Sequence, residues 1–290
     1  MKKIIVITGP TGVGKTKLSV ELAKKINGEI INADAMQVYS GLDIGTAKIR
    51  EDEKENIPHH LFDICDVLDN YTIYDYQKDC RKKIDEIINR GKTPILVGGS
   101  GLYIKAALYD YEFNEESFYS EFNELTNEEL LEEIRKDHET DIHINNRKRL
   151  VRELNKIKNN TVNTNNGKNP IYDFTLIGLT TDREKLYDII NKRVDIMIEE
   201  GLIDEVKEYF NKNINSKAIM TGIGYKELYK YFNNEISLDE AINLIKKNSR
   251  NFAKRQYTFY NHQMDVKWFN VNFNDFNETV NDVYNYVKNS

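Results

Sequence analysis

The residues best suited to chemistry form a glycine-rich loop close to the N-terminus. The loop consists of Gly9, Pro10, Thr11, Gly12, Val13, Gly14, Lys15 and Thr16, and it fits the pattern G-x-x-x-x-G-K-[ST] at every fixed position. Its glycines let backbone N–H groups converge on phosphate oxygens, and the N-terminus of a following helix adds partial positive charge. Lys15 supplies a full charge and Thr16 offers a hydroxyl to Mg²⁺. The loop therefore predicts a phosphate site with Mg²⁺ as its cofactor.

The rest of a nucleoside triphosphatase site is not evident. Such sites also place an acidic residue for Mg²⁺ at the end of another apolar strand. The run Pro94–Val97 ends instead in Gly98 and Gly99, and the strand-end acid of this region is Asp34. Asp34 could accept a proton or a hydrogen bond from a substrate amine or hydroxyl. It could equally cap the next segment, so chemistry other than ATP hydrolysis is open.

Eight motifs then follow one another in the order and spacing of a single family. They read GPTGVGKT, NADAMQVYSGLDIGTAK, IPHHLFD, VGGSGLY, IHINNRKRLVREL, RVDIMIEEGLIDEV, GIGYKE and RNFAKRQYTFY. They span nearly the whole chain, which resembles the tRNA dimethylallyltransferases, also called tRNA isopentenyltransferases. The resemblance implies transfer of a dimethylallyl group from dimethylallyl diphosphate to the exocyclic amine of adenine at tRNA position 37, beside the anticodon. The glycine-rich loop would then stabilise a leaving pyrophosphate.

The resemblance also implies roles for single residues. Lys15 and the loop amides would bind the diphosphate, with Thr16 on Mg²⁺. Asp34 would act as general base on the adenine amine, and Thr11 would lie near the reacting groups. The implied tRNA contacts at this end of the chain are Asp34, Ala35, Met36, Gln37 and Ser100. The family usually has threonine where this chain has Ser100, and the hydroxyl is kept.

Arg193 is a candidate on its own pattern. It shares a helical stripe with Leu186, Ile190 and Met197, so its guanidinium falls on an otherwise apolar face. A buried arginine needs an anion. A structural salt bridge would satisfy that need as well as a ligand would. The resemblance makes the diphosphate the partner and adds Arg193 to the catalytic residues.

Two basic clusters are the candidates for binding the RNA backbone. The first contains Lys148, Arg149 and Arg152, beside Arg147, and the second contains Arg250, Lys254 and Arg255. Phe252, Tyr257, Phe259 and Tyr260 alternate with the second cluster. Basic residues along a backbone, with aromatic rings for bases, are typical of single-stranded RNA recognition. A solvated helix face and core aromatics are the alternative interpretation.

The elements that must position these residues alternate between strand and helix. Apolar runs predict strands at 4–7, 29–34, 93–99 and 174–179, and helical stripes follow at 18–26 and 73–87, with Gly28 as a helix C-cap. The pattern predicts a P-loop-type α/β fold, a doubly wound parallel sheet flanked by helices. We expect the catalytic core at 1–112 and 171–290, mostly helical towards its C-terminus. We expect a helical insertion that contacts tRNA at 113–170, with 155–170 as an exposed loop.

Composition sets broad limits on the class of protein. The chain has 290 residues, a formal net charge of -6 and two cysteines without metal-type spacing. We expect a monomeric cytoplasmic protein with no signal peptide and no membrane partner. The alternatives to tRNA prenylation are an adenylate isopentenyltransferase, a P-loop small-molecule kinase and an RNA-binding module. The two basic clusters argue against free adenylate, and the intact loop argues against a binding module.

Overall fold

The computed structural model describes residues 3–113, 119–159 and 166–290. The chain divides into two compact units. The core unit comprises Met1–Leu108 and Ile171–Ser290, and the insertion unit comprises Tyr109–Pro170. The insertion therefore begins at Tyr109, whereas the sequence predicts that it begins at residue 113. It ends at Pro170, as predicted. We describe each unit by itself.

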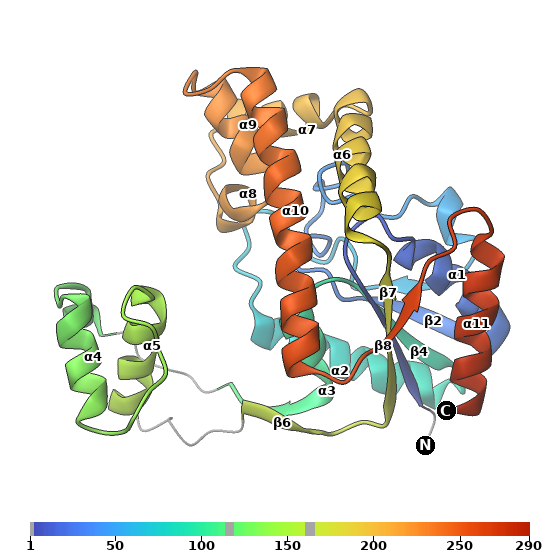
Figure 1. Ribbon diagram of the computed structural model, residues 1–290, viewed down its shortest axis with the longest axis horizontal. Coiled ribbons are helices and arrows are strands. Elements are labelled where there is room, and N and C mark those ends of the chain that lie inside the picture. Colours follow the sequence, from blue (N-terminus) through green and yellow to red (C-terminus); the bar gives the residue numbers. More distant parts are fainter. Residues whose placement is uncertain (1–2, 114–118, 160–165) are drawn as a thin grey trace. The chain divides into compact units, whose positions relative to one another are not determined.

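The core unit is built on one parallel sheet. Its six strands lie in the order β3-β2-β4-β1-β7-β8 (Figure 1). The strands are β1 Ile4–Thr8, β2 Gly28–Asn32, β3 His59–His60, β4 Thr93–Val97, β7 Phe174–Thr180 and β8 Lys267–Asn270. Strands β1, β2 and β4 are buried along nearly their whole length, as strands covered by helices on both faces must be. The predicted fold class is confirmed.

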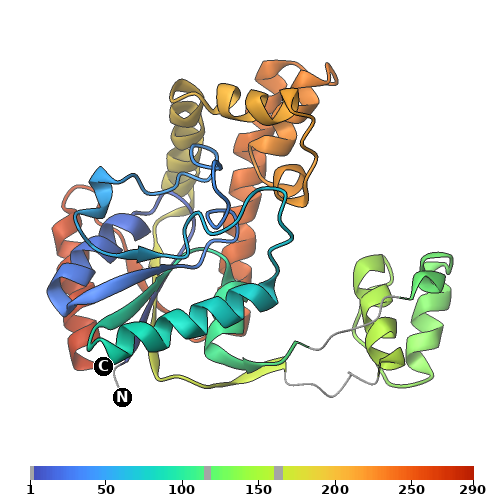
Figure 2. The same ribbon diagram turned by 180° about the vertical axis from the view of Figure 1, so that it is seen from behind.

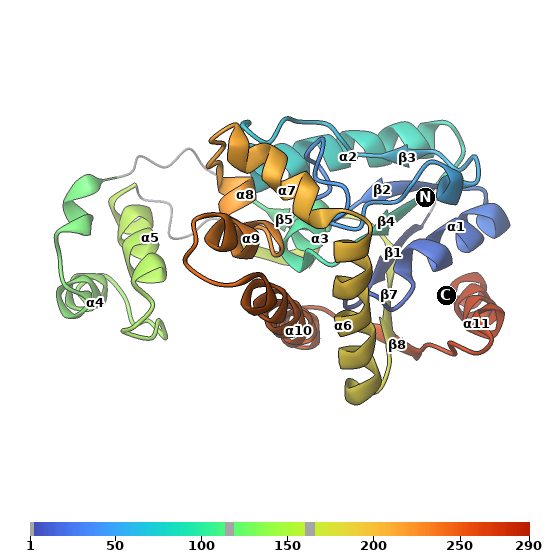
Figure 3. The ribbon, with the colours of Figure 1, turned by 90° about the horizontal axis from the view of Figure 1, so that it is seen from above.

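Helices cover both faces of this sheet. They are α1 Lys15–Ile26, α2 Ile73–Asn89, α3 Gly101–Leu108, α6 Arg183–Glu199, α7 Leu202–Asn211, α8 Lys217–Thr221, α9 Tyr225–Phe232, α10 Leu238–Gln263 and α11 Phe276–Asn289, with a short 3-10 turn at Asp52–Lys54. Figure 3 shows α2 on one side of the sheet and α1 with α11 on the other. Among the helices described, none combines the length and apolarity needed to cross a membrane.

The first helix ends one residue before the sequence predicts. Asn27 takes the left-handed C-cap position of α1, with φ of 54°. The prediction of Gly28 as the cap is wrong, because Gly28 is already the first residue of β2. Its lack of a side chain serves packing instead: a Cβ there would lie 2.6 Å from Cδ1 of Ile95 on the neighbouring strand.

The insertion unit is less helical than predicted. Two helices, α4 Asn127–Arg135 and α5 Arg147–Lys158, pack side by side around buried leucines (Figure 2), and a 3-10 turn at Ser120–Asn123 precedes them. Residues 136–146 are not helical. The predicted loop 155–170 is also corrected: α5 runs to Lys158, and β6 Asn166–Pro170 pairs antiparallel with β5 Tyr109–Tyr111. Residues 160–165 of that prediction lie outside the described residues.

The chain between β2 and β3 has little regular structure, yet it is firmly held. We call residues 34–50 the wall segment. Glu205 of α7 accepts hydrogen bonds from the backbone N–H groups of Asp43, Ile44 and Gly45 at 3.1, 2.7 and 3.1 Å. Lys48, whose side chain is 5% exposed, donates to the Tyr39 carbonyl and pairs with Asp43 and Asp63. The Glu205 carboxylate, distant in sequence, and the Lys48 ammonium group thus hold this segment in place.

Replacing Glu205 with alanine should lower the free energy of unfolding by about 1–3 kcal/mol. The three backbone N–H groups that now share its carboxylate would lose their acceptor. Glu208 of the same helix is the matched control, because its ion pair with Lys212 is exposed. Glu208→Ala should change stability by less than about 0.5 kcal/mol. Denaturant titration of both variants measures the difference, and equal values would contradict a holding role for Glu205.

Candidate functional site

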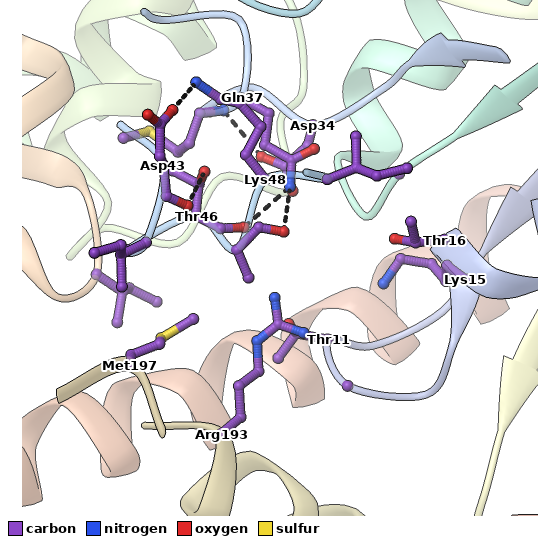
Figure 4. A pocket seen from close by; sticks show the side chains of 18 of the residues that line it. Thr11, Lys15, Thr16, Asp34, Gln37, Asp43, Thr46, Lys48, Arg193 and Met197 are labelled. Carbon is purple, nitrogen blue, oxygen red and sulfur yellow. Dashed lines mark hydrogen bonds and ion pairs between the residues drawn. The ribbon is translucent and has the colours of Figure 1, made fainter. Parts of the chain in front are cut away.

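The core unit contains a cavity of about 1070 Å³ at the carboxyl ends of the parallel strands. Open α/β sheets bind ligands at this edge. The glycine-rich loop, the wall segment, α6, the turn 221–226 and α10 all contribute to its lining. Figure 4 shows side chains from the loop, the wall segment and α6 pointing into this space.

The glycine-rich loop supplies a lysine that is held by its own backbone. Lys15 donates from Nζ to the carbonyl oxygens of Gly9 and Pro10 at 2.9 and 2.7 Å. Burial, and then the nearby charge of Arg193, lower the pKa of Lys15 to about 7, while Asp34 opposes the shift. Without a ligand, therefore, the ammonium group is poorly stabilised. An anion bound in the loop would reverse that.

Arg193 reaches the cavity from α6. The predicted apolar stripe is present, since Leu186, Ile190 and Met197 of the same helix are buried. Nε of Arg193 is itself buried and has no hydrogen-bond partner among the described residues. Burial lowers the pKa of the guanidinium, and Asp34 and then Glu200 act against that shift. Among the described residues no carboxylate forms an ion pair with Arg193, so the structural salt bridge of the alternative interpretation is not seen there.

Asp34 follows β2 and combines both of the interpretations given to it. One of its oxygens, Oδ1, accepts a hydrogen bond from the Met36 N–H at 2.9 Å, so the side chain does shape the next turn. The other oxygen accepts no hydrogen bond within the part of the chain that is described. Asp34 lines the cavity and faces both Lys15 and Arg193. One oxygen thus orients the carboxylate and one remains for a ligand.

The other predicted contacts near the loop share the cavity with Asp34. Thr11, Thr16, Ala35, Met36, Gln37 and Ser100 all line the cavity. Ser100 accepts a hydrogen bond on Oγ from the Ala35 N–H at 3.0 Å, so its hydroxyl fixes the wall segment. Gln37 donates to the Thr46 carbonyl at 3.0 Å. Both side chains help to hold the wall in place.

The first basic cluster lies on the insertion unit. Lys148, Arg149 and Arg152 of α5 are exposed, as residues that bind a backbone must be. Arg147 is different, because its guanidinium donates to the carbonyl oxygens of Asn123 and Leu125 at 2.8 and 2.7 Å. Arg147 therefore holds the insertion unit together.

The second basic cluster lies on α10 of the core unit. Lys254 and Arg255 are exposed, and Arg255 lines the cavity. Arg250 is half-buried and donates to Asn191 of α6 at 2.5 Å, so it joins two helices.

The aromatic residues beside this cluster divide between surface and core. Phe252 lines the cavity. Tyr260 is fully buried, and Tyr257 packs against the main core and interacts with the Thr180 hydroxyl at 2.8 Å. For these two tyrosines the alternative interpretation, core aromatics, applies, because Tyr260 is fully buried and Tyr257 packs against the main core.

Sequence reasoning missed several residues that build the site. Glu205, Lys48 and Gln256 lie inside the motifs quoted above, yet the sequence indicates no partner for any of them. Glu205 contacts residues about 160 positions away, and Gln256 contacts Gly99 across 157 positions. Their motifs were the available signal, but a single sequence does not pair distant positions.

Comparisons with known proteins agree on one family. Residues 37–263 match the family described as IPP transferase. A tRNA dimethylallyltransferase of Anoxybacillus flavithermus is 44% identical over 99% of this chain and 96% of its own. The solved tRNA isopentenylpyrophosphate transferase of Bacillus halodurans superposes with a TM-score of 0.80 at 39% identity, covering 100% of this chain and 96% of that one. A eukaryotic dimethylallyltransferase, solved acting on tRNA, gives a TM-score of 0.80 at 29% identity over 93% of this chain and 74% of its own.

The lowered pKa of Lys15 predicts how diphosphate binding depends on pH. Below about pH 7 the free protein carries a charged Lys15, and above it a mostly neutral one. Because a bound diphosphate favours the charged form, affinity should fall as the pH rises above about 7, by up to roughly tenfold per pH unit. Calorimetry with inorganic pyrophosphate and a chelator, from pH 6 to 9, measures this.

Lys15→Arg is the control for ionisation of the ligand itself, because arginine stays charged throughout this range. Its pH dependence should be flatter than that of the wild type. Identical curves for the two proteins would show that Lys15 does not titrate in this range.

Proposed function

The chain belongs to the IPP transferase family, and we propose that its cavity transfers a dimethylallyl group from dimethylallyl diphosphate to the exocyclic amine of adenine at tRNA position 37, beside the anticodon, releasing pyrophosphate. Membership rests on the match over 37–263 and on the near full-length relatives. The direct test is to incubate the protein with dimethylallyl diphosphate and unmodified tRNA, digest the RNA and look for prenylated adenosine. Finding none would refute the proposal.

The observation that supports this chemistry best is the pair of cations in the cavity. Lys15 and Arg193 come from different elements, approach closely enough for one to shift the pKa of the other, and have no carboxylate bonded to them among the described residues. Two partly buried positive charges without a bonded carboxylate favour a multiply charged anion. A diphosphate fits both, and it gains more charge as its bond to carbon breaks. Fixed charges aimed at that change stabilise the transition state more than the ground state.

The roles follow from where each group lies. The amine nitrogen would form a bond to the first carbon of the dimethylallyl group as that carbon's bond to oxygen breaks. The bonding electrons leave with the pyrophosphate, held by Lys15, Arg193 and the loop N–H groups. The proton released from the amine goes to Asp34, through the oxygen that is not bonded to Met36. Thr11 also lines the cavity, and family resemblance assigns it to the surroundings of the reacting groups.

Mg²⁺ suits the residues present only if the substrate supplies most of its ligands. Thr16 is exposed to the cavity and offers one hydroxyl oxygen. The described residues contain no group of three or more His, Cys, Asp or Glu side chains able to hold a metal. Mg²⁺ commonly keeps several waters and binds through phosphates with few protein oxygens. When bound, it would neutralise charge on the diphosphate, and Thr16 would be its protein ligand.

A small-molecule kinase would need a further acid for its metal, and β4 runs instead into Gly98 and Gly99. An adenylate isopentenyltransferase would have no use for the exposed basic face of α5. We therefore assign tRNA contact to Lys148, Arg149 and Arg152 of the insertion unit and to Lys254 and Arg255 of α10, and retain the expectation of a cytoplasmic monomer.

Asp34→Asn should slow prenyl transfer by about a hundredfold or more while tRNA still binds. Asparagine keeps an oxygen for the Met36 N–H, so the turn should persist. Asp43→Asn is the matched control, because Asp43 also lines the cavity but pairs with Lys48. It should retain a rate within a few-fold of the wild type. Single-turnover assays at saturating tRNA would compare them, and equal rates for all three proteins would remove Asp34 from the chemistry.

Arg149→Ala combined with Arg152→Ala should raise the Michaelis constant for tRNA and flatten its dependence on salt. Each phosphate contact that is lost lowers the number of counterions released when tRNA binds. The constant for dimethylallyl diphosphate should stay about the same. The control pair is Arg135→Ala with Lys136→Ala, at the C-terminal end of α4 in the same unit, which should have a smaller effect. Measuring the Michaelis constant for tRNA at two salt concentrations tests this. An unchanged dependence on salt would show that the α5 cluster is a solvated helix face.

A further inference from the structure

Gln256 of α10 is a polar side chain buried beside the glycine-rich turn after β4. It is 5% exposed and lines the cavity. Its Nε2 donates to the carbonyl oxygen of Gly99 at 3.1 Å. The contact is close enough that a Cβ at Gly99 would lie 2.0 Å from Nε2. The amide is therefore held against the turn that follows β4.

The other end of this amide has no partner. Oε1 of Gln256 is buried and accepts no hydrogen bond from any described residue. The hydroxyl of Tyr260, one turn further along α10, is also buried and does not donate to this oxygen. Because Nε2 is engaged with Gly99, the amide cannot exchange its two ends without losing that bond. A buried acceptor in such a fixed orientation favours a ligand that brings a donor.

The turn that holds this amide adjoins Asp34. Gly98 packs so tightly on Ala33 that a Cβ there would lie 2.2 Å from the Ala33 carbonyl group. Ser100 bonds to Ala35 through its hydroxyl and to Ala33 through its backbone. The turn 98–100 therefore touches the residues on both sides of Asp34, while Gln256 is bonded to the middle of the same turn.

We propose that Gln256 is a specificity-determining residue for the acceptor base, and that its Oε1 accepts a hydrogen bond from the exocyclic amine of the target adenine. The proposal rests on the function proposed above. A primary amine has two N–H groups. One proton is lost to Asp34 as nitrogen bonds to the prenyl carbon and the pyrophosphate leaves with the electrons of the C–O bond. The second N–H stays on the nitrogen, and Gln256 holds it.

The consequence is selection for a base that carries an amine. A keto oxygen at the same ring position would place an acceptor against the Gln256 oxygen and the Asp34 carboxylate. A base with hydrogen at that position would leave both acceptors unpaired. A substrate without the amine leaves buried polar groups of the site unpaired, and a site of this kind discriminates strongly against that substrate.

The test compares the binding of two anticodon stem-loop RNAs that carry adenine or unsubstituted purine at the target position, without prenyl donor. The wild type should prefer adenine by about tenfold or more, and Gln256→Met should reduce this preference by about three- to tenfold. Gln263→Leu is the matched control, because Gln263 lies on the same helix and is exposed, with its Oε1 bonded to Lys105. It should keep the wild-type preference.

A purely structural role gives a different result. If Gln256 only supports the turn at Gly99, Gln256→Met weakens the binding of both RNAs equally. An unchanged ratio of the two affinities therefore overturns the proposal. Gln256→Leu gives the same test if the methionine variant does not fold. Failure of the wild type to prenylate tRNA would refute the proposed function itself, whereas an unchanged ratio with an active wild type refutes only the role of Gln256.

Discussion

The site depends on bringing two cations into one partly buried space without giving them a bonded carboxylate. Lys15 is satisfied only by carbonyl oxygens of its own loop, and Arg193 keeps a buried Nε without a partner among the described residues. Each charge is costly where it lies, as the lowered pKa values of both groups show. A group held in this way gains more from an incoming anion than a solvated lysine would. The free energy that keeps these two groups charged in the free protein is therefore recovered when an anion binds, and this recovery contributes to the affinity for the anion.

The fold keeps these cations in place with elements that are far apart in the sequence. The parallel sheet sets the loop after β1, Asp34 after β2 and Ser100 after β4 along a single edge. Arg193 comes from α6, which Arg250 and Lys246 join to α10 through Asn191 and Asp195. The wall segment would otherwise be a long irregular connection, and Glu205 and Lys48 make it a fixed surface. Rigid support for a ligand site therefore comes from polar contacts as much as from the apolar core.

Local patterns predicted the local parts of this site. The glycine-rich loop, the strand before it and the stripe that carries Arg193 all depend on residues within a few positions of each other, and the structure has them. The predictions of a cap at Gly28 and of a loop at 155–170 were wrong because both depend on distant residues. Gly28 packs on Ile95, and part of the predicted loop pairs with Tyr109–Tyr111. The burial of Tyr260 and the packing of Tyr257 on the core were not predicted for the same reason. Helical spacing places both on α10 but does not say which side of that helix the core covers.

The cavity joins this charged end to an apolar end, and the reaction needs both. Val194, Met197, Leu202 and Ile245 line it from the helices that rise beyond the sheet. Such a surface accepts a short hydrocarbon chain and excludes water. An allylic carbon that loses its diphosphate becomes positively charged, and Lys15 and Arg193 alone would oppose that change. Once the diphosphate lies between them and the carbon, the same cations favour departure of the leaving group, while Asp34 supplies a negative charge that acts on both cations. Binding of the donor must therefore reverse the electrostatic effect of the site before the amine can be alkylated.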